Sequence, residues 1–144
     1  MTRINCIPVE DLMDQHLLAE YRELPMVGAS LNRSRKSKSF HYSDSKEYVL
    51  NKGHVRFFYD KGGFLKKRYA EIKAELVNRG FSLSEDREDN FKYFLPSEMN
   101  NWVPTEEDKA VSLERINERV AQKPEWYRYY GKAVDSKIGE IEYV

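Results

Sequence analysis

The chain has 144 residues, of which 40% are hydrophobic and 33% are charged, a composition typical of one domain with a modest hydrophobic core. Its formal net charge of zero does not by itself favour binding to nucleic acid. Its single cysteine, Cys6, excludes an intrachain disulfide, and its three histidines do not have the spacing of metal ligands. Because no stretch approaches the roughly 18 apolar residues of a membrane helix and the start lacks a signal peptide, we expect a soluble, intracellular protein with no metal, cofactor or membrane partner.

The start of the chain, Met1-Thr2-Arg3, carries a candidate nucleophile. A small second residue permits removal of the initiator methionine, which would leave Thr2 with a free α-amine beside a cation. An α-amine titrates near ~7.7 to 8.0 and a lysine near ~10.4, so far more of the α-amine is uncharged at neutral pH. Such an amine can attack an electrophilic carbon and form a Schiff base. The alternative is that this N-terminus, like most, is frayed and inert.

The first predicted helix runs from Val9 to Leu24. Pro8 suits a first helical turn, and Pro25 is expected to stop the helix. The apolar stripe recurs at helical spacing and consists of Met13, Leu17, Tyr21 and Leu24.

One face of this helix is polar in a way that suggests a binding site. At the helical turn angle, His16 and Glu23 lie within about 20° of each other, and Gln15 and Arg22 form a parallel row. Ala19 lies between the rows and leaves a shallow gap that a ligand could enter. The alternative is an ordinary solvent-facing surface with helix ion pairs.

The N-terminal segment is long enough to reach back along this helix. Six residue steps from Thr2 to Pro8 span at most about 20 to 22 Å, and the helix rises about 22 Å from Pro8 to Glu23. We therefore expect Ile4 to Ile7 to run extended and antiparallel to the helix, with the Thr2 amine near the Glu23 carboxylate.

Two further helices are predicted, from Gly63 to Arg79 with Gly80 as the C-terminal cap, and from an N-cap at Thr105 until Pro124. Residues 25–62 and 81–104 are expected to form long irregular connections, and residues 137–144 a tail. The predicted fold is therefore all-α: a compact single domain, residues 1–136, of three main helices with long irregular loops and an extended N-terminal segment.

Basic residues gather in residues 33–38, 66–68 and 115–132, and acidic residues in 85–89 and 106–108. One positive face could result, although for any single cluster a solvated loop or helix face is the favoured explanation. The last basic stretch includes the run Trp126 to Lys132, which interleaves four aromatic side chains with two cations. Such a run suits nucleic acid, because aromatic rings stack on bases and cations meet phosphates, but it also suits core packing.

Several segments together resemble the phage pyrimidine-dimer DNA glycosylase family called endonuclease V. The order and spacing both match, and the segments are Thr2 to Asn5, Asp14 to Pro25, Gly53 to Val55, Phe57 to Lys61 and Trp126 to Lys132. The resemblance covers nearly the whole chain and is weakest in residues 28–50, 82–112 and after residue 132.

The resemblance implies a bifunctional DNA repair glycosylase and abasic-site lyase that excises cyclobutane pyrimidine dimers. The α-amine of Thr2 would attack C1′ of the 5′ nucleotide and form an imine, and Glu23 would stabilise the cationic sugar before β-elimination breaks the strand. Its partner would be double-stranded DNA containing pyrimidine dimers or abasic sites, and the protein would be a phage-encoded monomer in the host cytoplasm. The implied DNA-binding residues are Arg3, Gln15, His16, Arg22, Arg115, Arg119 and Arg128.

The chain departs from the family pattern at Met26, where an arginine is expected, and in its neutral net charge. Arg33 or Arg35 could supply the absent charge if the following loop folds over the site. Fewer phosphate contacts would weaken non-specific DNA binding and its salt dependence. Two other functions remain open: a catalytically inactive DNA-damage-binding module and a metal-dependent nuclease.

Overall fold

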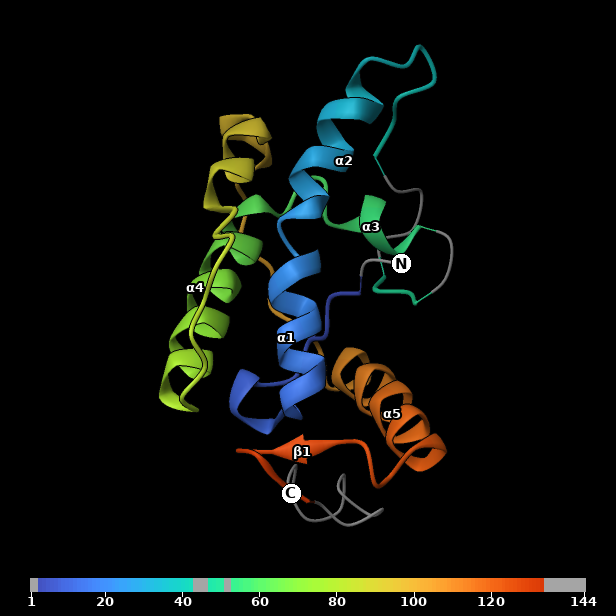
Figure 1. Ribbon diagram of the computed structural model, residues 1–144. Helices are drawn as coiled ribbons and strands as arrows, with labels where there is room; N and C mark the ends of the chain where they lie inside the picture. Colours follow the sequence, from blue (N-terminus) through green and yellow to red (C-terminus); the bar gives the residue numbers. More distant parts are fainter. Residues whose placement is uncertain (1–2, 43–46, 51–52, 134–144) are drawn as a thin grey trace.

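The computed structural model describes residues 3–42, 47–50 and 53–133, and it is built mainly from helices (Figure 1). The α-helices are α1 (Asp14–Glu23), α2 (Met26–Arg35), α3 (His54–Phe57), α4 (Gly62–Asn78) and α5 (Glu106–Gln122). Short 3-10 helices cover Val9–Asp11 (η1), Glu88–Tyr93 (η2) and Pro96–Glu98 (η3), and strands β1 (Arg128–Tyr129) and β2 (Lys132–Ala133) form a hairpin. The all-α prediction is confirmed.

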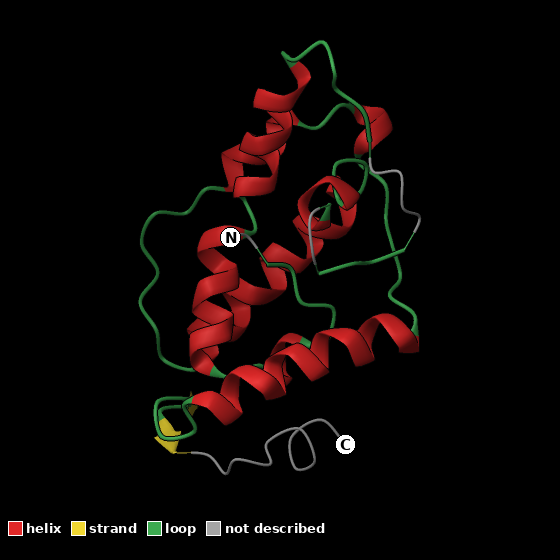
Figure 2. Cartoon of the chain, turned by 90° about the vertical axis from the view of Figure 1, so that its right-hand side faces the viewer, coloured by secondary structure: helices red, strands yellow, loops and turns green. Residues whose placement is uncertain are grey.

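The core forms around α1, which has α4 along one side and α5 on the other (Figure 1). The α1 side chains Leu17 and Tyr21 pack against the buried stripe of α4, and the ring of Tyr21 stacks on that of Tyr69 at 5.5 Å. In α5, Ile116 and Val120 are buried. Figure 2 shows α5 running beneath the other helices. Burial of each of these apolar side chains stabilises the fold by about 1.5 to 3 kcal/mol, and this holds α1 between its neighbours.

The predicted first helix is interrupted. η1 ends at Asp11, and the backbone of Leu12 and Met13 is extended before α1 begins at Asp14. Both side chains at the break are fully buried, so the extended backbone turns two apolar residues into the core. Val9 O keeps its hydrogen bond from Leu12 N at 3.2 Å, and the next carbonyls are bound by Arg79, which donates to Leu12 O at 2.7 Å and to Glu10 O at 3.3 Å. A distant arginine therefore replaces the missing helical hydrogen bonds.

The prediction that Pro25 starts a long irregular connection is wrong. Pro25 has φ −64° and ψ −17°, which are helical angles, and α2 follows it directly. Proline lacks the N–H that would continue α1 but is compatible with a first helical turn, so it separates two helices instead of ending helical structure. The carbonyl of Pro25 accepts a hydrogen bond from Asn90 Nδ2 at 2.9 Å. A side chain at Gly28 would lie 2.3 Å from Asn90 O, so this glycine permits α2 to approach η2 closely.

The second predicted connection, residues 81–104, also contains short helices, namely η2 and η3. The predictions for the last two helices are confirmed within a residue or two. Gly80 follows α4 with φ +94°, as expected of a C-terminal cap. Thr105 Oγ1 accepts from Asp108 N at 3.1 Å, and Asp108 Oδ2 accepts from Thr105 N at 2.9 Å, which forms the predicted capping box of α5.

The N-terminal segment runs antiparallel to α1, as predicted. Asn5 binds Glu20 in the middle of α1, and the Arg3 backbone is hydrogen-bonded to Glu23 at its end. The backbone N–H of Cys6 donates to Ser112 Oγ of α5 at 3.1 Å, so the segment lies between these two helices. Thr2 and the predicted tail, 137–144, lie outside the described residues. In the described ranges, no helix has the length and apolar character needed to span a membrane.

Candidate functional site

A cavity of about 330 Å³ opens between α1, the N-terminal segment, α5 and the C-terminal aromatic run. Ala19 forms part of its wall, and the predicted gap beside this small residue is therefore present. The cavity brings together five of the predicted site residues, namely Arg3, His16, Glu23, Arg115 and Arg119. It is completed by Asn5, Glu20, Ile116 and Tyr127.

Glu23 places its carboxyl group in the cavity as the last residue of α1. The side chain is half-buried, and burial raises the pKa of this carboxyl group. A hydrogen bond from the Arg3 backbone and the charge of Arg22 oppose that rise without cancelling it. A carboxylate with a raised pKa is a stronger base, so the position suits both proton transfer and stabilisation of a nearby positive charge.

Glu20, one turn earlier on α1, and Asn5 form the floor of the cavity, and Arg68, which does not itself line the cavity, pairs with Glu20. The carboxylate of Glu20 pairs with the buried Arg68 guanidinium, and its Oε1 accepts from Asn5 Nδ2 at 2.9 Å. Arg68 also donates to Ile7 O at 2.9 Å. These contacts were not predicted from the sequence, although Arg68 shares a face of α4 with the buried apolar stripe, where a cation is unusual.

Three arginines give the cavity a positive lining. Arg3 Nη1 donates to Leu50 O at 2.5 Å, and burial followed by the charge of Arg115 lowers the pKa of Arg3. Arg115 lies 4.0 Å from Glu118, and Arg119 is exposed. Arginine stays protonated despite such shifts, so the lining attracts anions and suits phosphate groups in particular.

His16 is held in the cavity wall as a neutral imidazole. Its ring stacks on Tyr127 at 4.8 Å with an interplanar angle of 16°. Burial, reinforced by the charge of Arg119, lowers the pKa of His16 to about 4. The Nδ1 atom is buried and has no hydrogen-bond partner among the residues that the structure describes. At neutral pH this histidine therefore contributes a polar ring but no positive charge.

Three predicted site residues lie outside the cavity. Gln15 Nε2 donates to Trp126 O at 2.7 Å, and its Oε1 accepts from Arg128 N at 3.0 Å. The Arg128 guanidinium donates to Glu125 O at 2.6 Å. Arg22 is exposed and lines a neighbouring cavity of about 450 Å³ together with Met26. Gln15 and Arg128 thus hold the aromatic run in place through the contacts that the structure shows.

The aromatic run forms a hairpin that is docked on the start of α1. Asp14 accepts from Tyr130 N at 3.1 Å and from Gly131 N at 2.8 Å, and the Arg79 guanidinium lies over the ring of Tyr129 at 4.8 Å. The positive φ values of Tyr130 and Gly131 give the tight turn that the hairpin needs. Tyr127 is buried, as the core-packing interpretation expects, whereas Trp126 is 56% exposed, and its interpretation as a contact to nucleic acid stays a prediction.

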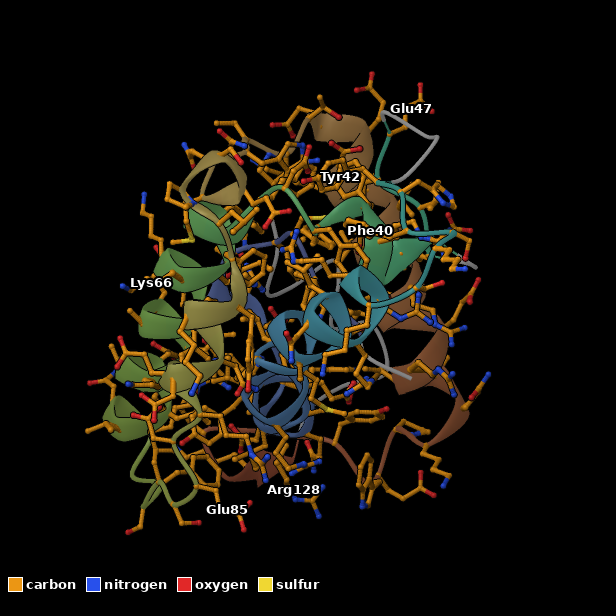
Figure 3. All side chains as sticks on the ribbon, turned by 90° about the horizontal axis from the view of Figure 1, so that it is seen from above. Phe40, Tyr42, Glu47, Lys66, Glu85 and Arg128 are labelled. Carbon is orange, nitrogen blue, oxygen red and sulfur yellow. The ribbon has the colours of Figure 1, made fainter. Side chains whose placement is uncertain are left out.

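The interpretation that Arg35 replaces the absent charge at position 26 is wrong. Arg35 Nη2 pairs with the buried Glu98 at 2.6 Å, and Tyr42 donates to the same carboxylate at 2.5 Å. Figure 3 shows Tyr42 and Phe40 well apart from Arg128, which belongs to the hairpin beside the cavity. The Arg35 charge is therefore neutralised in a different part of the molecule.

The family described as pyrimidine dimer DNA glycosylase matches residues 1–89. The matched region contains the N-terminal segment and helices α1 to α4, and with them Glu23 and the floor of the cavity. Helix α5 and the aromatic hairpin, which supply Arg115, Arg119 and Tyr127, follow the matched region.

Proposed function

Because the chain belongs to the pyrimidine dimer DNA glycosylase family, we propose that it excises these dimers through the α-amine of Thr2 and then cleaves the strand as an abasic-site lyase. The observation that supports this mechanism most is the place of Glu23. Its carboxylate, with a raised pKa, faces a cavity whose wall includes the N-terminal segment itself. The chain therefore runs directly from the proposed nucleophile into the wall that carries the proposed acid-base group.

In the first step the uncharged amine of Thr2 attacks C1′ of the 5′ nucleotide of the dimer. The glycosidic C1′–N bond breaks, and its electron pair leaves with the base. The sugar carbon is positively charged in the transition state, and a fixed carboxylate at Glu23 stabilises that charge in a partly buried cavity. Loss of a proton from nitrogen and opening of the sugar ring then give the imine.

In the second step the imine makes the hydrogens on C2′ acidic. Removal of one of them, followed by departure of the 3′ phosphate, breaks the strand by β-elimination. Glu23 is the proposed acceptor of this proton, because its raised pKa brings its basicity closer to that of a working general base. Water then hydrolyses the imine and releases the enzyme.

The cations of the site bind the DNA backbone in this proposal. Arg3, Arg115 and Arg119 bind phosphates at the cavity, and the exposed Arg22 binds one beside it. His16, as a neutral ring, contacts the lesion, while Gln15 and Arg128 act by holding the hairpin. The partner is duplex DNA that contains a dimer or an abasic site, and the protein acts as a monomer.

The main alternative is a damage-binding module without catalysis. A surface that only binds DNA gains nothing from a half-buried carboxylate among phosphate-binding arginines, because that carboxylate repels the phosphates. The position of Glu23 therefore favours an enzyme.

Treatment with borohydride tests the mechanism on a duplex with one cyclobutane dimer, in the presence of EDTA. We expect a covalent protein–DNA adduct, because borohydride reduces the imine to a stable amine, and we expect strand cleavage that EDTA does not inhibit. Binding without an adduct or cleavage would indicate the binding module, and cleavage that EDTA abolishes would indicate a metal-dependent nuclease.

A further inference from the structure

The backbone of Ile4 is bound on both sides by side chains from distant parts of the chain. Ile4 N donates to His54 Nε2 at 2.8 Å, and Ile4 O accepts from the Tyr48 hydroxyl at 2.6 Å. Ile4 is fully buried and belongs to no strand or helix, so these two side chains replace the backbone partners that secondary structure would supply.

The hydrogen bonds of His54 determine which nitrogen carries its proton. Nδ1 lies 2.7 Å from Val49 O, and a carbonyl oxygen only accepts, so Nδ1 is the donor. Nε2 then presents its lone pair to the Ile4 N–H. Burial lowers the pKa of His54 to about 4, which keeps the ring in this neutral form. Gly53, with φ +113°, provides the turn that begins α3 at His54.

Tyr48 connects Ile4 to His54 and to α5. Its hydroxyl donates to Ile4 O and lies 2.9 Å from Ser112 Oγ, which in turn accepts from Cys6 N. The Tyr48 ring packs edge-on against the His54 ring at 5.4 Å. His54 and Tyr48 therefore form one buried clamp on Ile4, supported by α3 and α5.

The clamp lies two residues from the proposed nucleophile. Two residue steps span at most about 7 Å, so a fixed Ile4 confines the Thr2 amine to a small volume. Neither clamp residue lines the cavity. We propose that His54 and Tyr48 are positioning residues, which fix Ile4 and thereby hold the N-terminal amine at the distance that attack on C1′ requires. This inference rests on the proposed function.

The expected effect follows from the geometry of attack. A nucleophile held close to its target reacts as part of one complex, and a displacement of about 1 Å can reduce the rate about 100-fold. Loss of the clamp should therefore slow imine formation while DNA affinity remains, because the arginines that bind phosphate are in place. A purely structural role would instead lower the rate only in proportion to the fraction of folded protein.

Four variants separate these possibilities. Tyr48→Phe removes the hydroxyl and keeps the ring, and Tyr69→Phe is the matched control, because Tyr69 is equally buried and its hydroxyl binds Asp86 and Arg87 instead. His54→Asn can place an amide N–H near the Nδ1 position and so retains only the bond to Val49. His54→Gln can place an amide oxygen near the Nε2 position and so retains the acceptor for Ile4 N–H.

The measurements are the single-turnover rate of borohydride trapping on a dimer-containing duplex, the Kd for that duplex and the thermal unfolding midpoint. We expect trapping to slow by about 10- to 100-fold in Tyr48→Phe and His54→Asn, with an unchanged Kd for the duplex. The thermal unfolding midpoint of Tyr48→Phe should be close to that of Tyr69→Phe. We expect His54→Gln to trap faster than His54→Asn, and Tyr69→Phe to trap at the rate of the unmodified protein.

Unchanged trapping rates in Tyr48→Phe and His54→Asn would overturn the proposal, as would rates that fall only with the folded fraction. Both results require that the unmodified protein forms the adduct. If the unmodified protein forms none, the amine mechanism itself is wrong, so the failure of the clamp and the failure of the proposed function give different results.

Discussion

The floor of the cavity and its rim each present a glutamate from α1, but the two carboxylates have different surroundings. On the floor, Glu20 is 1% exposed and is bound by Arg68 and Asn5. At the rim, Glu23 is half-buried, and burial raises its pKa. The comparison shows how one helix can use the same residue type for two purposes. The fully paired charge of Glu20 stabilises the fold, and the incompletely stabilised charge of Glu23 is available for chemistry.

The first way to test this comparison is to remove the charge of Glu20 on the floor of the cavity. Glu20→Gln leaves the Arg68 charge buried without its partner, which should lower the free energy of unfolding by about 3 to 5 kcal/mol. The urea denaturation midpoint checks this. Glu71→Gln, which changes an exposed glutamate of α4, is the control and should have little effect. Equal midpoints for the two variants would show that Glu20 does not support the scaffold.

Removing the charge of Glu23 at the rim should have the opposite effect, a loss of activity with little loss of stability. Glu23→Gln should slow dimer excision by about 100- to 1,000-fold, because the amide no longer stabilises positive charge or accepts a proton. Its denaturation midpoint should remain close to that of the unmodified protein. Its Kd for dimer-containing DNA should be the same or lower, because the amide no longer repels phosphates. Single-turnover excision at saturating enzyme measures the effect, and excision at the original rate would remove Glu23 from the mechanism.

His54, which binds the N-terminal segment at Ile4, gives a test through the pH dependence of stability. Burial lowers the pKa of His54 from 6.5 to about 4, so between these values the unfolded chain binds more protons than the folded protein. Stability from this group is therefore complete above pH 6.5 and is lost as the pH falls toward 4, by about 2 to 3 kcal/mol.

Denaturation midpoints measured from pH 7 to pH 4 check this prediction. In His54→Gln the decline should be shallower, because one of the two histidines with a lowered pKa is absent and only His16 remains of that pair. A decline of the same steepness in both proteins would mean that His54 does not titrate as its burial indicates.

The smallest expected effect concerns the positive lining. Arg119→Ala removes one exposed cation at the cavity, which should reduce the slope of log affinity against log salt by about 0.9 if the residue binds one phosphate. Lys67→Ala removes an exposed cation of α4 and is the control. Binding titrations at several salt concentrations distinguish the two, and identical slopes would exclude Arg119 from phosphate binding.

The parts of the fold that depend on local sequence were predictable. Thr105 and Asp108 specify the start of α5, Gly80 specifies the end of α4, and helical periodicity identified both helices. The polar face of α1 led to a cavity at Ala19, with His16 and Glu23 in its wall. In these cases neighbouring residues alone determine the backbone.

The features that the sequence did not reveal depend on distant contacts. The break at Leu12 is stabilised by Arg79, which is 67 residues away, and Gln15 contacts the hairpin 111 residues away instead of the cavity. Pro25 is locally ambiguous, because the same residue can stop a helix or begin one, and the contact with Asn90 accompanies the second outcome. Periodicity cannot distinguish such alternatives.

The central claim is that the nitrogen of Thr2 becomes bonded to the sugar. The most direct test is to trap the protein on a dimer-containing duplex with borohydride, digest the adduct and locate the modified atom by mass spectrometry. The account predicts that the chain begins at Thr2 and that its α-nitrogen carries the sugar fragment. A fragment on a lysine side chain, or excision at full rate by protein whose α-amine is acetylated, would contradict it.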